Sequence, residues 1–130
     1  MFNGNCKEAF ALYERVLGGK IEAQFTFGET PEQEHVPPGY ADKIMHVSLT
    51  LGNTSLMGSD DPMGTYETPK GISVSLHIDD PAEAERVFNG LAEGGTVTMP
   101  LEETFWAKRF GMCLDRFAIP WMINCSKPMP

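Results

Sequence analysis

The sequence of 130 residues lacks the marks of a membrane or secreted protein. No apolar run approaches the about 20 residues that span a bilayer. The first residues contain no basic region followed by an apolar stretch, so no secretory signal is expected. The three cysteines, Cys6, Cys113 and Cys125, are odd in number and form no C-x-x-C motif, which argues against a disulfide scaffold. We therefore expect a protein of the reducing cytoplasm with no membrane partner.

Basic residues are also scarce. The chain has 10 Lys and Arg against 18 Asp and Glu, which gives a formal net charge of −8. Such a surface repels phosphate backbones, so no nucleic-acid partner is expected. The length suits a single domain over residues 1–130, and the hydrophobic fraction of 42% is ordinary for a soluble globular protein.

One pattern is present twice. Asn5 to Ala9 opens a stretch of helical periodicity that ends at Gly18-Gly19, and Asp80 to Ala84 opens a second stretch that ends at Gly94-Gly95. Each stretch is followed by strand-like segments. Two copies of one helix-plus-strands unit predict two half-sheets related by a pseudo-two-fold axis, with a functional cleft between them.

Each helical stretch carries start and stop signals. Asn5 and Asp80 are the expected N-caps, and Glu8 and Glu83 are expected to close a capping box three residues later. The glycine pairs end the helices, because glycine accepts the left-handed conformation at a helix C-terminus. The buried stripes are Phe10, Tyr13, Val16 and Leu17 in the first helix and Ala84, Val87, Phe88 and Leu91 in the second.

After each helix, apolar residues alternate with polar ones, which predicts strands. The pair Gly52-Asn53 predicts a hairpin turn. The expected strands cover residues 21–27, 45–51, 55–57, 72–78, 110–114 and 120–124. In the first of them Ile21, Ala23, Phe25 and Phe27 are the alternating apolar positions. We expect the helices to pack on the side of Met45, Val47, Leu49 and Leu51 and on the side of Ile72, Val74, Leu76 and Ile78.

The two copies differ in two places. Gly19 and Leu56 are 37 positions apart, whereas Gly95 and Trp121 are 26 apart, so the first copy carries an insertion. We place it at residues 28–40, as a surface loop and candidate lid. The first copy also lacks the opening strand that the second copy has before its helix, so its first strand is missing or truncated.

Together these features predict an α+β fold. They predict two βαβββ modules, residues 1–60 and 71–130, with a cleft between their sheets. The proline- and glycine-bearing segment 60–71 is the expected linker.

Three parts of the chain are similar to one known family. They are the opening Phe2-Asn3-Gly4-Asn5-Cys6-Lys7-Glu8-Ala9-Phe10, the strand end Leu56-Met57-Gly58-Ser59-Asp60, and the closing segments 99–106, 109–111 and 115–121. In them the chain resembles the vicinal oxygen chelate superfamily, which includes glyoxalase I, bleomycin and fosfomycin resistance proteins and extradiol dioxygenases. Within the superfamily, the sequence is more similar to the PhnB-like branch, which is also labelled 3-demethylubiquinone-9 3-methyltransferase-like. Ala118 stands where that branch usually has glycine, so we expect this turn to differ.

The resemblance implies a curled mixed sheet around the cleft, with the helices on its convex side. It also implies a metal site whose ligand positions are altered here. Catalytic families of the superfamily hold a divalent metal with His, Gln or Glu on the first and last strands of each copy. Those positions fall on Met57, Ser73 and Met122, and the fourth falls on the strand that this chain does not show. A serine hydroxyl is a poor ligand for a divalent ion, and a thioether suits soft ions. We expect a degenerate metal site with no metal ligands, and no methyl-donor cofactor, because no glycine-rich cofactor loop is present.

The strand alternation predicts a mostly neutral ligand site. The expected ligand-binding residues are His46, Ser48, Met57, Ser73, Ser75, His77, Trp106, Arg109 and Met122, with Thr50, Ser55 and Cys113 on the same face. His46 either shapes the cavity through hydrogen bonds or takes part in chemistry. Trp106 either holds a planar ligand at the rim or plugs one end of the barrel. We interpret Cys113 as a structural cysteine, because no histidine is placed beside it, and His35 as a loop residue without a role.

Three functions compete at this point. The first is a metal-independent protein that binds or modifies a small molecule, acting as a homodimer. The second is a metal-dependent lyase or dioxygenase of the glyoxalase type that recruits His46 and His77 as ligands. The third is a structural or regulatory protein without a ligand, which would have a closed cavity.

Overall fold

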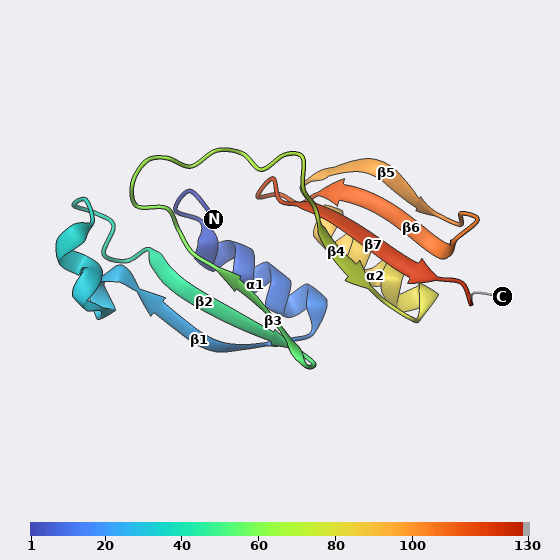
Figure 1. Ribbon diagram of the computed structural model, residues 1–130, viewed down its shortest axis with the longest axis horizontal. Helices are drawn as coiled ribbons and strands as arrows, with labels where there is room; N and C mark the ends of the chain where they lie inside the picture. Colours follow the sequence, from blue (N-terminus) through green and yellow to red (C-terminus); the bar gives the residue numbers. More distant parts are fainter. Residues whose placement is uncertain (129–130) are drawn as a thin grey trace. The chain divides into compact units, whose positions relative to one another are not determined.

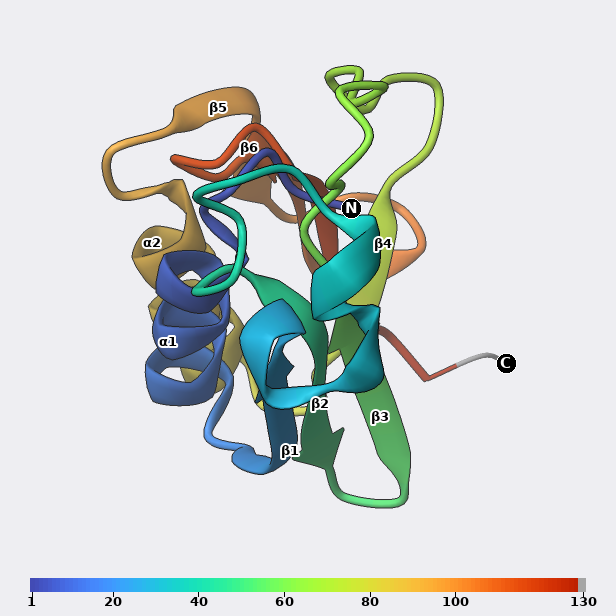
Figure 2. The same ribbon diagram turned by 90° about the vertical axis from the view of Figure 1, so that its left-hand side faces the viewer.

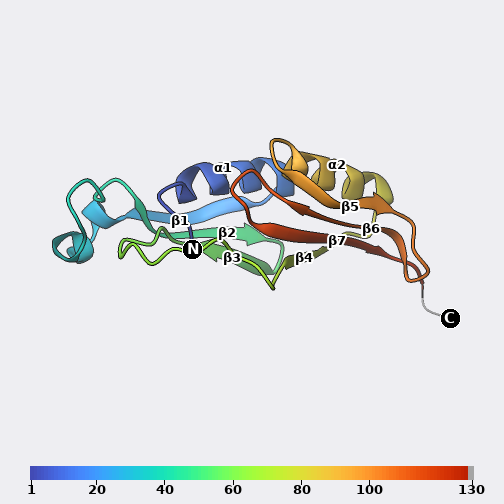
Figure 3. The same cartoon turned by 90° about the horizontal axis from the view of Figure 1, so that it is seen from above.

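Each half of the duplicated sequence folds as one helix against one face of one sheet (Figures 1 and 3). The computed structural model describes residues 1–128, except the side chains of Glu32 and Gln33. It divides into two compact units, Met1–Glu67 and Thr68–Pro130.

The first unit contains α1 (Cys6–Leu17) and the antiparallel sheet β1-β2-β3. Its strands are β1 (Lys20–Thr26), β2 (Ile44–Leu51) and β3 (Thr54–Gly58), and the predicted Gly52-Asn53 hairpin joins the last two. Before α1, Phe2 forms an isolated parallel bridge with Asp60. In the described residues, the opening strand of this copy is thus reduced to one bridge. This agrees with the prediction that the first strand is missing or truncated.

The second unit repeats this topology with a complete opening strand. It contains β4 (Val74–His77), α2 (Pro81–Ala92), β5 (Thr96–Glu102), β6 (Ala107–Leu114) and β7 (Pro120–Ser126). The sheet order is β4-β7-β6-β5, in which β4 runs parallel to β7 and the other pairs are antiparallel. The predicted pair of βαβββ modules is confirmed.

The opening strand of the second unit is shorter than predicted. We expected residues 72–78 in one strand with Ile72 facing the helix, but β4 covers only Val74–His77, and Ile72 is 75% exposed. Pairing explains the limit, because the register of β4 with β7 begins at Val74 opposite Trp121.

The insertion of the first unit is not an open loop. It contains two 3-10 helices, η1 (Phe27–Glu29) and η2 (Pro31–His35), at the end of the sheet where β1 leaves and β2 enters (Figures 1 and 2). The Tyr40 hydroxyl donates a hydrogen bond to the Asp61 carbonyl (2.6 Å), and Phe27 is buried with its ring 5.9 Å from that of Tyr40. These contacts fix both ends of the insertion to the first unit.

The first helix is capped by a distant residue. Asn5 makes no side-chain cap hydrogen bond, so the expected Asn5–Glu8 capping box is wrong. The buried Asp60 carboxylate takes that role instead: its Oδ1 accepts from the backbone N–H groups of Gly4 (2.9 Å) and Cys6 (3.0 Å). Its Oδ2 accepts from the Ile44 N–H (2.9 Å). One carboxylate therefore joins the start of α1, the start of β2 and the end of the β3 segment.

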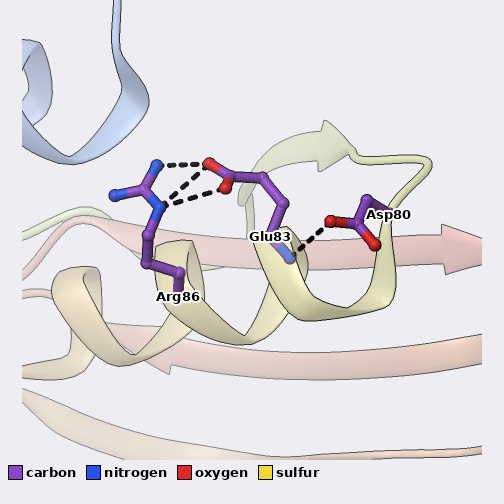
Figure 4. A network of polar contacts seen from close by, with 3 residues as sticks. All are labelled: Asp80, Glu83 and Arg86. Carbon is purple, nitrogen blue, oxygen red and sulfur yellow. Dashed lines mark hydrogen bonds and ion pairs between the residues drawn. The ribbon is translucent and has the colours of Figure 1, made fainter.

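The second helix has the predicted cap but not the predicted box. Asp80 accepts a hydrogen bond from the backbone N–H of Glu83 (3.3 Å), and Pro81 occupies the first turn (Figure 4). The Glu83 carboxylate is held by Arg86 one turn later, and this hydrogen bond lowers the pKa of Glu83. The i,i+3 ion pair replaces the second half of the box.

The two glycines of each Gly-Gly pair have different roles. Gly18 (φ 77°) and Gly94 (φ 76°) adopt the left-handed conformation that turns the chain out of the helix. Gly19 and Gly95 instead pass close to the sheet, where an added Cβ would lie 2.4 Å from the Thr50 carbonyl oxygen and 2.1 Å from that of Leu114. The repeat therefore encodes both a turn and a close contact of helix end and strand.

A bulge in β1 reverses part of the expected alternation. Ile21 pairs with Leu49, but Ala23 pairs with Ser48, so one extra residue is inserted between them. Phe25 then pairs with His46 and is 45% exposed. The alternating positions Ile21, Ala23 and Phe25 therefore do not share one face, because a shift of one residue moves side chains to the other face.

The turn between β6 and β7 holds alanine in a glycine conformation. Ala118 has φ 67°, and its N–H donates to the Asp115 carbonyl (2.9 Å). A left-handed conformation costs a residue with a Cβ about 1–2 kcal/mol. The turn keeps the geometry that glycine favours although the side chain differs.

Replacing Ala118 with glycine is therefore expected to stabilise the protein. The strain energy that is relieved exceeds the free-energy cost of the greater backbone entropy of glycine in the unfolded chain. The free energy of unfolding, measured with urea, should therefore rise by about 0.5–1 kcal/mol. Ala82→Gly, on the exposed side of α2, is the matched control and should lose about 1 kcal/mol. Equal losses in both variants would contradict the role assigned to this turn.

Candidate functional site

Glycines show which face of each sheet meets its helix. An added Cβ on Gly58 would lie 2.4 Å from the Phe10 ring of α1, and Gly58 pairs with the fully buried Val47. An added Cβ on Gly111 would lie 2.9 Å from the Phe88 ring of α2, and Gly111 pairs with the fully buried Ile123. The neighbouring positions in each strand must point to the opposite face, which we call the open face of each unit.

The open face of the first unit brings several predicted residues together. Ser48 pairs with Met57 and Thr50 pairs with Ser55, and His46 precedes them on β2. The bulge adds Phe25 beside His46. Met57 is 64% exposed, whereas His46 and Ser48 are half-buried. The sequence alone did not place Phe25 here, because nothing in its local pattern marks the extra residue.

The open face of the second unit carries Ser75, His77 and Met122. Ser75 pairs with Met122, and Met122 pairs on its other side with Met112. His77 pairs with Asn124, and its Nε2 lies 2.8 Å from the Asp79 carboxylate. His77 is exposed, so this contact lies in solvent. Ser73 comes just before the strand.

Cys113 lies on the other face. It pairs with the buried Trp121 and is 1% exposed, so the prediction that it shares one face with Met122 is wrong, although it belongs to the lining of the pocket described below. Gly111 and Asp115 share its parity, and all three point toward the helix side of β6. Burial and the neighbouring Asp115 carboxylate raise the pKa of the Cys113 thiol to about 11. The thiol is therefore protonated at neutral pH, as a structural cysteine is.

A pocket of about 540 Å³ opens in the second unit beside the turn that joins β6 and β7. It is bounded by the segment before β4, by one residue of β5 and by the facing ends of β6 and β7. Its lining consists of Pro69, Lys70, Gly71, Ile72, Ser73, Thr98, Met112, Cys113, Leu114, Pro120, Trp121 and Met122. Pockets of this size and mostly apolar lining are typical of sites for small organic molecules.

One buried carboxylate fixes the wall of this pocket. Asp115 is 3% exposed, and its Oδ2 accepts a hydrogen bond from the Trp121 indole (2.9 Å). Its Oδ1 accepts from the backbone N–H groups of Phe117 (2.8 Å) and Ile119 (3.0 Å). The same side chain therefore shapes the β6–β7 turn and locks the indole in place.

Two of the predicted site residues, Ser73 and Met122, line this pocket. Trp106 does not, because it precedes β6 at the strand end opposite the pocket, where it contacts the rings of Phe105 (4.8 Å) and Phe110 (5.3 Å). Arg109 pairs with the buried Cys125, and its Nε lies 3.2 Å from a carboxylate oxygen of Glu85 in α2. The guanidinium is therefore held on the helix side.

The pocket also contains residues that the sequence did not single out. Lys70 belongs to the segment interpreted as a linker, and Ile72 to the start of an expected strand. Thr98 is the extra residue of a bulge, because Val97 pairs with Cys113 and Met99 with Met112. The alternation of Phe110 to Leu114 could have identified Met112, but no sequence signal marks the bulge.

The donor atoms at the implied metal positions do not suit a divalent metal. Met57 and Met122 offer thioethers and Ser73 offers a hydroxyl, a set that fits no common divalent ion. Elsewhere in the described residues, no three His, Cys, Asp or Glu side chains come close enough to hold a metal ion. None of the described helices is long and apolar enough to cross a bilayer.

The duplicated βαβββ architecture defines the class. It is the fold of the vicinal oxygen chelate superfamily, and a glyoxalase/bleomycin resistance protein/dioxygenase family enzyme from Burkholderia phytofirmans shares it. That enzyme is 14% identical, with a TM-score of 0.67 over 98% of this chain and 94% of its own. At this identity the likeness shows the fold alone.

Within that class, the chain belongs to the 3-demethylubiquinone-9 3-methyltransferase family, whose model matches residues 1–124. This is the PhnB-like branch that the sequence resembles. Protein YjdN of Escherichia coli is 35% identical over 137 residues, with 99% of this chain and 93% of YjdN covered. The crystal structure of protein PA1353 from Pseudomonas aeruginosa is 54% identical, with a TM-score of 0.89 over 98% of this chain and 93% of its own.

Proposed function

We propose that this protein binds a small organic molecule in the pocket of its second unit and does so without a divalent metal. The observation that carries the proposal is the pocket itself, with about 540 Å³ of space and a lining of mostly apolar side chains and thioethers, together with two hydroxyls, one thiol and one lysine. Membership of the glyoxalase-type superfamily supports a small-molecule role, and the altered donor set supports the absence of metal chemistry. His46, Ser48 and Met57 remain predicted ligand-binding residues on the open face of the first unit, and Ser75 and His77 remain so on the open face of the second.

A thermal-shift screen of small organic molecules tests the binding function. Ligands that enter the pocket raise the melting temperature by mass action, since they bind the folded chain alone. A structural protein without a ligand would show no shift with any compound at concentrations well above typical dissociation constants.

The first prediction under this proposal concerns metal content. Protein purified under mild conditions should contain well below one equivalent of zinc, nickel or iron when measured by mass spectrometry, because a serine and two methionines hold such ions weakly. One full equivalent that survives dialysis would overturn the metal-independent function. It would favour the metal-dependent alternative, with His46 as the suspected ligand.

We also propose that the protein is a homodimer. Both sheets have open edges, and β5 is an edge strand whose Val97 and Met99 are 48% and 44% exposed. Unpaired edges with apolar side chains favour association with a second copy. Light scattering at micromolar concentration should give about twice the chain mass of 14.4 kDa. A clean monomer at that concentration would contradict this prediction.

A further inference from the structure

One pocket residue carries a charge, and it is positive. Of the residues that line the pocket of the second unit, Lys70 is the one Lys, Arg, Asp or Glu. The chain as a whole has a net charge of −8. Lys70 is exposed, so a cationic residue borders an apolar pocket in a chain whose net charge is negative.

Lys70 has no acidic partner among the side chains that the structure describes. Three other cations of the second unit are paired with a carboxylate: Arg86 with Glu83, Arg109 with Glu85 at 3.2 Å, and Lys127 with Glu103 at 2.8 Å. Among the described residues, Lys108 and Arg116 share with Lys70 the lack of such a pair, but neither lines the pocket. The carboxylate behind the pocket wall, Asp115, is already bound by two backbone N–H groups and the Trp121 indole. The Lys70 ammonium is thus free to pair with a group from outside the chain.

The other lining residues determine which uncharged groups a ligand can contact in this pocket. Ile72, Met112, Met122 and the two prolines offer apolar contact, and thioether side chains adapt to different shapes. Ser73 and Thr98 add hydroxyls that donate hydrogen bonds. The pocket therefore combines one cation and two neutral donors with a larger apolar area.

On the basis of the proposed function, we infer that the natural ligand is an organic anion. It consists of an apolar body that contacts the methionines and one acidic group, such as a carboxylate or sulfonate, that pairs with Lys70. A charge-assisted hydrogen bond is stronger than a neutral one. The negative net charge of the protein repels all anions. An organic anion offsets this repulsion through apolar contact with the pocket, whereas a small inorganic anion does not.

Two fluorescent probes with the same ring framework test this inference. 8-Anilinonaphthalene-1-sulfonate carries an anionic group, and N-phenyl-1-naphthylamine is the same body without it. Titration of the full-length protein should give tighter binding of the sulfonate by about tenfold, the gain expected from one charged hydrogen bond. That advantage should shrink as salt rises to about 1 M, where the Debye length is about 3 Å.

Lys70→Gln should weaken sulfonate binding about tenfold and change binding of the neutral probe less than twofold. Lys108→Gln removes the same charge near the start of β6, the strand end opposite the pocket, and should leave both affinities unchanged. Equal binding of the two probes, or equal effects of the two substitutions, would overturn the anionic ligand while the binding function stands. Failure of the wild-type protein to bind either probe would instead contradict the proposed function.

Discussion

Replacing Asp60 with alanine is expected to lower the free energy of unfolding by about 3–5 kcal/mol. The carboxylate is 1% exposed and accepts hydrogen bonds from Gly4, Cys6 and Ile44. Its removal leaves three buried or part-buried N–H groups without an acceptor, and each such group carries a desolvation cost. Urea unfolding followed by circular dichroism measures the loss.

Two further variants show that the hydrogen bonds cause this loss. Asp60→Asn keeps one acceptor oxygen and nearly the same volume, so it should retain part of the stability. Asp42→Ala removes an exposed carboxylate from the same unit and should change the stability by less than about 0.5 kcal/mol. If Asp60→Ala were as mild as Asp42→Ala, Asp60 would not be the residue that joins α1, β2 and the end of β3.

The second large effect is expected at Trp121. Trp121→Ala should cost about 3–5 kcal/mol, because the side chain is 1% exposed and is the largest of the fully buried residues. The loss also leaves the Asp115 Oδ2 without the indole donor that it accepts from at 2.9 Å. Differential scanning calorimetry or urea unfolding gives the size of the effect.

The chain offers a control of the same residue type. Trp106 is 41% exposed, so Trp106→Ala should cost much less than Trp121→Ala. Trp121→Phe keeps most of the apolar volume but removes the indole donor, and we expect an intermediate loss of about 1–2 kcal/mol. Similar losses for the two alanine variants would contradict the central place of Trp121 in the second unit.

Local signals predicted the helices and their ends well. The stripe of α2, the cap by Asp80 and the exit at Gly18 depend on residues near one another in sequence, and each was confirmed. The stripe of α1 was confirmed at Phe10, Tyr13 and Val16 but not at Leu17, which is only half-buried. The duplication then predicted the module topology. The cap of α1 could not be found in this way, because Asp60 is 54 positions from Cys6 and only tertiary structure brings them together.

The site was less accessible to sequence reasoning. Alternation predicted the open faces of β2 and β7, including Ser48 and Met122. It failed at Cys113, which was predicted to share a face with Met122. Cys113 does share a face with Gly111 and Asp115, but that face is the helix side of β6. It also missed the bulges that reposition Phe25 and insert Thr98, since an extra residue in a strand leaves no local mark. The pocket depends on a segment before β4 whose composition indicated only a linker.

The central claim is that the pocket of the second unit binds a small organic molecule without metal, and titration of chelator-treated protein with N-phenyl-1-naphthylamine tests it most directly. Met122→Trp fills the pocket, whereas Asn89→Trp adds the same side chain on the exposed side of α2. We predict saturable binding of one probe per chain in the wild-type protein and in Asn89→Trp, and its loss in Met122→Trp. Binding that needs an added divalent metal, or that persists unchanged in Met122→Trp, would contradict the account.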